Sequence, residues 1–237
     1  MRVTFLAHDG FLIELNTVCL LFDWWKEPIP PPLDKPLLVF ISHRHEDHFN
    51  PEVFTLAERK ADIQFLLGSD FHLLSRNLEK WRLTPEAAAK CRRCGKHDVF
   101  QPLPAVTVET FPSTDEGVAW MVTAEDKAIF HAGDLNWWHW AEEGDAWNRN
   151  MEANFKRYTE PLRGRRADLA MLPLDPRLES GGDLGPDYFL GLMDVRRFFP
   201  MHQWDHFEFT DEFLKRYPQF APITVKIHHN LETFQLD

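Results

Sequence analysis

The apolar positions along the chain alternate between short β-type runs and stretches with helical spacing. Each β-type run is rich in β-branched and aromatic residues and is bounded by turn residues. The run LLVFIS at 37–42 is apolar throughout, which is typical of a strand buried on both faces. These runs predict strands at 3–7, 11–15, 18–22, 37–42, 63–67, 106–111, 118–124, 127–133, 167–174, 197–202 and 223–228.

Helical spacing occupies most of the segments between these runs. In the first such segment Pro51 stands at a first-turn position, where its missing backbone donor is not needed. The pattern predicts helices at 51–59, 70–80, 84–93, 145–160, 185–195 and 210–217. The apolar positions expected on the helix at 145–160 are Trp147, Met151, Phe155 and Tyr158.

No Ser/Gly-rich linker or low-complexity block divides the chain. A proline-rich connector, PIPPPLDKP at 28–36, can be neither helix nor central strand. Both halves of the chain pass from strand-rich to mixed strand and helix. This order predicts an α/β (α+β) protein of two similar halves, packed sheet against sheet with helices outside, within one domain spanning residues 1–237.

Composition narrows the class of protein. The 237 residues are 44% hydrophobic, which is enough for a substantial core. The formal charge of -11 repels phosphate backbones and disfavours broad nucleic-acid binding. No run approaches the roughly 20 apolar residues of a membrane span, and the opening residues meet Asp9 and Gly10 too early for a signal peptide. We therefore expect a cytoplasmic protein with no membrane partner.

The three cysteines give only weak signals. An odd number in a chain of this length argues against a disulfide framework. Cys91 and Cys94 form a lone CxxC after the helix-forming stretch TPEAAAK, and Gly95 suits a helix end. We expect a surface helix terminus there, with a metal or redox role as the alternative.

Metal-capable side chains directly follow three of the predicted strands, in LLVFISHRHEDH, KAIFHAGDLN and RRFFPMHQWDH. His43 and His45, two apart on an extended chain, point the same way and can hold one metal. Asp47 and His48 fall where the chain turns, so they can face a second position. Two divalent ions roughly 3.5–4 Å apart can activate water for hydrolysis, and imidazole with carboxylate suits zinc, iron or manganese.

The motif HRHEDH at 43–48 fits the HxHxDH signature of the metallo-β-lactamase fold. Three further motifs follow in that family's order: FLAHDGFLIEL…CLLFD ending at Asp23, FHAGD ending at Asp134, and FPMHQWD containing His202. The chain therefore resembles this superfamily over most of its length, and most closely the branch of the L-ascorbate-6-phosphate lactonases. The resemblance implies a four-layer αβ/βα sandwich of two mixed β-sheets flanked by helices.

The resemblance also implies a hydrolase with two divalent metal ions, zinc or manganese, with iron as an alternative. His43 and His45 would bind the first ion, and Asp134 would bridge both. The ligands of the second ion would be Asp47, His48 and His202. Asp47 would also orient the attacking hydroxide, so Asp47 and Asp134 are the candidate catalytic residues.

The chain departs from the family pattern where the first site normally has a third histidine. PSTDEG stands there, so Asp115 is the natural substitute and Glu116 its rival, unless STDEG is only a turn. A carboxylate in place of imidazole shifts the preference toward manganese or iron, or lowers the occupancy.

Residues near these motifs suggest how a small-molecule substrate is held. Trp137 and Trp138 follow Asp134 directly and either pack between layers or form an aromatic wall. Arg177 follows a predicted strand and either pairs with a substrate phosphate or carboxylate or forms a salt bridge to Asp175.

Three classes of function compete. The first is a metal-dependent hydrolase that cleaves an ester, lactone or phosphoester bond of a small molecule. A nuclease of the same fold is the alternative, and the acidic charge counts against it. The third is a metal-binding protein without catalysis, or an iron-dependent redox member with a degenerate first site. A homo-oligomer stays open.

Overall fold

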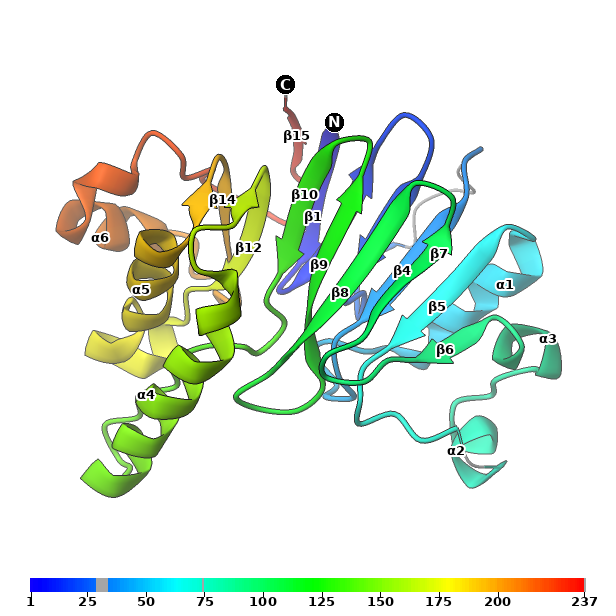
Figure 1. Cartoon of the computed structure of the whole chain (residues 1–237), viewed down its shortest axis with the longest axis horizontal. Coiled ribbons are helices and arrows are strands. Elements are labelled where there is room, and N and C mark those ends of the chain that lie inside the picture. The colour runs from blue at the N-terminus through cyan, green and yellow to red at the C-terminus, as the bar shows by residue number, and fades with distance from the viewer. Residues whose placement is uncertain (29–33, 74, 237) are drawn as a thin grey trace. The chain divides into compact units, whose positions relative to one another are not determined.

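Two mixed β-sheets form the framework of the chain (Figure 1). The computed structural model describes residues 1–28, 34–73 and 75–236. Part of the connector expected at 28–36 and one residue of the helix expected at 70–80 lie outside these described residues. Met1–Gly95 with Asn230–Asp237 makes up one compact unit, and Lys96–His229 makes up a second. The single domain expected over 1–237 stays a prediction.

The first unit contains a seven-stranded sheet. Its strands are β1 (Arg2–Ala7), β2 (Gly10–Glu14), β3 (Cys19–Phe22), β4 (Leu37–Ile41), β5 (Ile63–Leu67), β6 (Cys91–Arg93) and β15 (Thr233–Gln235). They lie in the order β15-β1-β2-β3-β4-β5-β6, antiparallel as far as β3 and parallel from there to β6. Because parallel strands end at the same edge, Asp23, Ser42 and Gly68 follow β3, β4 and β5 side by side.

Short helices and aromatic side chains cover this sheet. The helical segments of the unit are η1 (Pro51–Thr55), α1 (Leu56–Arg59), α2 (Ser75–Lys80) and α3 (Pro85–Ala88). Asn50 caps η1, since its Oδ1 accepts from Glu52 N at 3.0 Å. Phe49 packs edge-on against Phe71 and Trp81, and this cluster buries the residues that follow the HRHEDH motif.

The second unit contains a six-stranded sheet and a small two-stranded one. Its strands are β7 (Val99–Leu103), β8 (Val106–Pro112), β9 (Val118–Ala124), β10 (Lys127–His131), β12 (Leu169–Pro173) and β14 (Phe198–Met201), with β11 (Arg166–Ala167) and β13 (Asp194–Val195) paired separately. In the order β14-β12-β10-β9-β8-β7, pairing is parallel from β14 to β10 and antiparallel beyond it. The second sheet therefore mixes parallel and antiparallel halves as the first one does.

Three longer helices flank β12 and β14 in this unit (Figure 1). They are α4 (Asp145–Thr159), α5 (Leu184–Leu192) and α6 (Phe209–Arg216), with the 3-10 turns η2 (Glu160–Leu162), η3 (Pro176–Gly181) and η4 (Pro218–Phe220). The expected α/β class of two mixed sheets with helices is confirmed. Among the described residues, no helix combines the length and the apolar composition that crossing a membrane requires.

The predicted helix at 84–93 is wrong in its second half. The helix α3 ends at Ala88, and Cys91–Arg93 form the edge strand β6, which pairs in parallel with β5. TPEAAAK forms α3 as its composition favours, but the residues after it pair with β5 instead of continuing the helix. Burial raises the pKa of the Cys91 thiol to about 12, and Cys94 is fully buried, so neither thiol has the character of a reactive cysteine.

Two further expectations fail for reasons of tertiary contact. The strand predicted at 223–228 is a single bridge from Thr224 to Phe198, and the last strand is β15. Trp147, expected on the apolar face of α4, is 36% exposed. Asn148 is buried in its place, because its side-chain amide bonds the backbone N and O of Trp140.

Gly68 tests how tightly the ends of β4 and β5 are packed. A Cβ on Gly68 would lie 1.9 Å from the backbone oxygen of Ser42, so Gly68→Ala is expected to lower the free energy of unfolding by about 1–3 kcal/mol. Gly191→Ala is the control, since a Cβ added there would meet no atom within 4 Å beyond its chain neighbours and its own helix backbone, and the helix α5 should gain up to about 1 kcal/mol. Urea denaturation measures both, and equal effects of the two substitutions would contradict the close approach.

Candidate metal centre

The chain leaves β4 at Ile41 and turns through the HRHEDH motif toward η1. His43 and His48 are fully buried, His45 is exposed, and Asp47 is partly exposed. His43 Nε2 lies 3.0 Å from His45 Nδ1. Two ring nitrogens of one turn therefore face the same point, as two ligands of one cation would.

Asp23 orders this turn from the end of β3. It is fully buried and has a left-handed backbone with φ of 38°. Its Oδ1 accepts from Ser42 N at 2.7 Å, and its Oδ2 accepts from the Ser42 hydroxyl at 2.5 Å and lies 3.0 Å from His48 Nδ1. One carboxylate thus joins the ends of β3 and β4 to the buried histidine.

This network sets the tautomers of both buried histidines. Because the Ser42 hydroxyl gives its one proton to Asp23, it can only accept from His43 Nδ1, which lies 2.9 Å away. His48 in turn donates from Nδ1 to the Asp23 carboxylate. In each neutral ring the lone pair is then on Nε2, which is the arrangement that carboxylate partners impose on metal-binding histidines.

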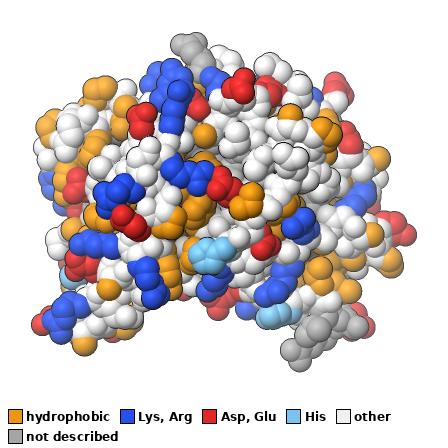
Figure 2. Space-filling model, in the orientation of Figure 1, with side chains coloured by type: hydrophobic (Ala, Val, Ile, Leu, Met, Phe, Trp, Pro, Cys, Tyr) orange, Lys and Arg blue, Asp and Glu red, His pale blue; other side chains and the backbone are white. Residues whose placement is uncertain are grey.

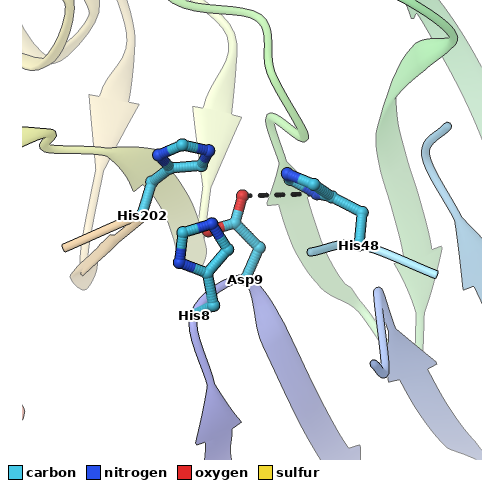
Figure 3. A group of neighbouring side chains, drawn as sticks. All are labelled: His8, Asp9, His48 and His202. Atoms are coloured by element: carbon cyan, nitrogen blue, oxygen red, sulfur yellow. Dashed lines mark ion pairs between the residues drawn. The ribbon is translucent and has the colours of Figure 1, made fainter. Parts of the chain in front are cut away.

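His8 and Asp9, in the turn between β1 and β2, add possible metal-ligand atoms. His8, Asp9 and His48 each offer a ligand atom within 4.8 Å of the other two. Figure 3 shows these three side chains, with the 3.5 Å ion pair from His48 Nδ1 to Asp9 Oδ2 dashed. His8 Nε2 also lies 3.4 Å from Asp47 Oδ2. The sequence pattern explained Asp9 only as a turn residue and therefore missed its place beside His48.

The buried carboxylates of the first unit indicate whether a cation would be stable there. Asp9 and Asp23 are both fully buried, and they and the partly exposed Asp47 each have an oxygen within 4.0 Å of a ring nitrogen of His48. Ionised carboxylates are costly to bury unless positive charge or several donors compensate them. Imidazole nitrogens together with carboxylate oxygens form the donor set of zinc, manganese and iron, so these residues fit a divalent ion.

The second unit places its candidate ligands at three strand ends. Asp134 follows β10 after Gly133, whose φ is 50°, and Asp115 follows β8. Each of these two carboxylates offers an oxygen within 4.8 Å of the other. His202 follows β14, and its Nε2 lies 3.4 Å from Asp134 Oδ1. Asp115 is exposed, whereas Asp134 and His202 are buried.

Asp175, at the end of β12, holds His202 as Asp23 holds His48. Its Oδ2 lies 3.1 Å from His202 Nδ1, and Arg177 donates to the same carboxylate at 2.6 Å. Burial alone would raise the pKa of the Asp175 carboxyl, but the hydrogen bonds from His202 and Arg177 hold this pKa below its usual value. The sequence pattern considered Asp175 only as a partner of Arg177 and missed its bond to His202.

The aromatic residues after Asp134 separate into two environments. The indole N–H of Trp138 donates to Asp134 O at 3.0 Å, and its ring lies 5.4 Å from that of His202. Trp137 instead packs against Phe155 and Tyr188 of α4 and α5. Of the two roles considered for Arg177, its ion pair with Asp175 is present.

Comparison with known proteins bears on the family. A family model described as the beta-lactamase superfamily domain matches residues 2–146. A UPF0173 metal-dependent hydrolase of Opitutus terrae is 28% identical over 145 residues, which are 56% of this chain and 63% of that protein. A relative from Mycolicibacterium smegmatis is 33% identical over 95 residues, which are 34% of this chain and 18% of that protein. The chain thus spans less than two thirds of the length of these curated relatives.

Solved structures agree with this match at the level of the fold. The structure of Igni18, described as a metallo hydrolase from the archaeon Ignicoccus hospitalis, superposes with a TM-score of 0.62 at 16% identity. The likeness covers 100% of this chain and 99% of that one, which confirms the expected fold. Because the family model covers more than half of the sequence, including the HRHEDH turn, the chain belongs to the beta-lactamase superfamily.

Proposed function

We propose that this chain is a metal-dependent hydrolase that cleaves an ester, lactone or phosphoester bond of a small molecule. The observation that carries the proposal is that each unit fixes a buried histidine through a buried carboxylate, Asp23 with His48 and Asp175 with His202. Such pairs turn the second ring nitrogen into a good metal ligand. The relative from Opitutus terrae, described as a metal-dependent hydrolase, supports the same class.

Two divalent ions would be held by the residues that the family motifs imply. We assign His43, His45 and Asp115 to the first ion and Asp134 to both. The ligands of the second ion would be Asp47, His48 and His202. When bound, such ions lower the pKa of a water molecule and polarise the bond to be cleaved. Zinc or manganese fits this set, and the carboxylate of Asp115 favours the harder manganese or iron over zinc.

The protein's own residues would position the reactants. Asp47 would orient the attacking water, and His8, at 3.4 Å, would hold the Asp47 carboxylate in place. Trp138 would contact the substrate because its ring lies beside that of His202. Arg177 would contact it because Arg177 bonds Asp175, which also bonds His202. The packing of Trp137 against α4 and α5 favours a structural role for that side chain. A lactone substrate is the choice that agrees with the lactonase-like motifs.

Two alternatives have less support. On the face drawn in Figure 2, Lys and Arg side chains are interspersed with Asp and Glu, unlike the continuous basic surface of nucleic-acid-binding proteins. This disfavours a nuclease. An iron-dependent redox reaction is favoured only by Asp115, and strong visible absorbance of the purified protein would support it.

Metal content and His48→Ala test the proposal directly. We expect close to two ions per chain by elemental analysis after purification without chelator, and about one in His48→Ala. Hydrolysis of a lactone, phosphodiester, thioester or β-lactam panel with manganese, zinc or iron should fall more than about 100-fold, beyond the 10–100-fold loss typical of a supporting residue. His97→Ala, at an exposed position, is the control. Equal activity of wild type and His48→Ala would exclude this site as the catalyst.

Asp23→Asn and Asp175→Asn test the carboxylate–histidine pairs. Each substitution keeps the shape of the side chain but removes the charge that fixes Nδ1 of a histidine. We expect metal affinity, measured by chelator competition, to fall about 10–100-fold in each variant. Asp34→Asn, at an exposed position, should leave the affinity unchanged. If both variants fold, by circular dichroism, and bind metal as wild type does, the pairs do not support ligands.

A further inference from the structure

The loop after β14 exposes a tryptophan on an unfavourable backbone. His202, Trp204 and Asp205 have φ of 63°, 53° and 63°, in the left-handed region that residues with a Cβ seldom adopt. Trp204 is 37% exposed, although an indole is among the side chains that gain most from burial. Strain of this kind gathers at functional sites, so the position of Trp204 suggests a role in binding.

Arg177 stacks on this tryptophan. Its guanidinium carbon lies 4.4 Å from the centroid of Trp204 and 5.7 Å from that of Trp140. Asp175 holds Nε and Nη2, and it supplies the only side-chain acceptor for this guanidinium among the residues that the structure describes. With the side chain 44% exposed, the remaining N–H groups are available to a ligand. Arg177 is thus a flat, oriented cation at the surface.

Two more indoles lie near this pair, of which Trp138 is buried and Trp140 is half-buried. The ring planes of Trp138 and Trp140 are 8° apart with centroids separated by 6.4 Å. The His202 ring contacts Trp138 on one side, at 5.4 Å, and Trp204 on another, at 5.8 Å. We call Trp138, Trp140, Arg177 and Trp204 the aromatic platform. It adjoins the histidine that we assign to the second ion.

A cavity that is lined by Arg177 but by none of the three indoles adjoins the platform. Arg177 lines a cavity of about 620 Å³, a volume typical of small-molecule sites. Arg216, the other arginine of the lining, is paired with Asp183 at 2.8 Å. Three glutamates also line this cavity: Glu179, Glu208 and Glu212. They repel negative charge throughout the cavity, so the carboxylate of a ligand would have to lie directly at the Arg177 guanidinium.

We propose that the aromatic platform binds a flat, unsaturated group that carries one carboxylate and forms part of the substrate. This inference rests on the proposed hydrolase function, whose substrate class it narrows. The planar group would stack on the accessible indoles Trp140 and Trp204, and the carboxylate would accept from the outer N–H groups of Arg177. Doubly charged phosphoesters would be disfavoured by the glutamates of the cavity.

Isothermal titration calorimetry of the metal-loaded protein, which measures the affinity for three non-hydrolysable probes, tests the platform. Benzoate carries the ring and the charge, cyclohexanecarboxylate has the charge without the flat ring, and benzamide has the ring without the charge. We expect benzoate to bind about three- to tenfold more tightly than cyclohexanecarboxylate and at least about tenfold more tightly than benzamide. Both carboxylates can also reach a metal ion, so their ratio isolates the contribution of stacking.

Trp204→Leu keeps apolar bulk but removes the indole. It should lower benzoate affinity about three- to tenfold and leave cyclohexanecarboxylate within about twofold. Arg177→Met, compared with wild type at equal metal content by elemental analysis, should lower the affinity for both carboxylates about tenfold and leave benzamide unchanged. Trp147→Leu is the matched control, since Trp147 is 36% exposed and lies on α4 outside the platform.

Three results would overturn the platform: equal affinity of wild type for benzoate and cyclohexanecarboxylate, an equal loss in Trp147→Leu and Trp204→Leu, or no binding of benzoate. Because binding is measured without turnover, failure of the platform is distinct from failure of the hydrolase proposal. If the wild-type protein binds metal and hydrolyses substrate but does not distinguish the three probes, only the platform is rejected. Selective binding by a protein that holds no metal and hydrolyses nothing rejects the proposed function instead.

Discussion

A buried carboxylate at a strand end is the constraint on which the candidate site of the first unit depends. Asp23 has no exposed surface, so its oxygens need donors from the protein, and they find them in Ser42 and His48. A buried ionised carboxylate that lost one of these donors would be destabilised by several kcal/mol. The end of β3, the end of β4 and the turn before η1 are therefore held together as one piece, and the histidine tautomers are fixed with them. Gly68 completes the packing, because only a residue without a side chain can lie against the Ser42 carbonyl.

The second unit meets the same requirement with a different outer partner. Asp175 follows β12 and binds His202 after β14, and these strands are parallel neighbours like β3 and β4. Here Arg177, rather than a serine, is the other donor to the carboxylate. Together with His202 it lowers the pKa of the Asp175 carboxyl despite the burial. Parallel pairing explains why both units can do this, since it brings successive strand ends to one edge of the sheet.

The sequence predicted features that depend on neighbours along the chain and missed those that depend on distant partners. The apolar runs of β4 and β12 and the HRHEDH turn carry their signal in a few consecutive residues, so the strands and the order of motifs were predictable. Cys91–Arg93 look helical locally and become a strand only because β5 offers a free edge. Asn148 displaces Trp147 from the buried face through bonds to Trp140, eight positions away. Asp175 lies 27 positions from His202, and no local pattern distinguishes that bond from a turn or an ion pair with Arg177.

The Asp175 carboxylate couples substrate preference to metal binding. Asp175 bonds both His202 and Arg177, so a change of Arg177 alters the charge that His202 experiences. If His202 is a ligand, Arg177 cannot be exchanged to suit another substrate without also changing the metal site. Trp140 and Trp204 make no hydrogen bond to this carboxylate among the bonds described, and they contact Arg177 only through their rings. Variation in substrate preference is therefore expected to fall on these two indoles, while Asp175, Arg177 and His202 are constrained to change together.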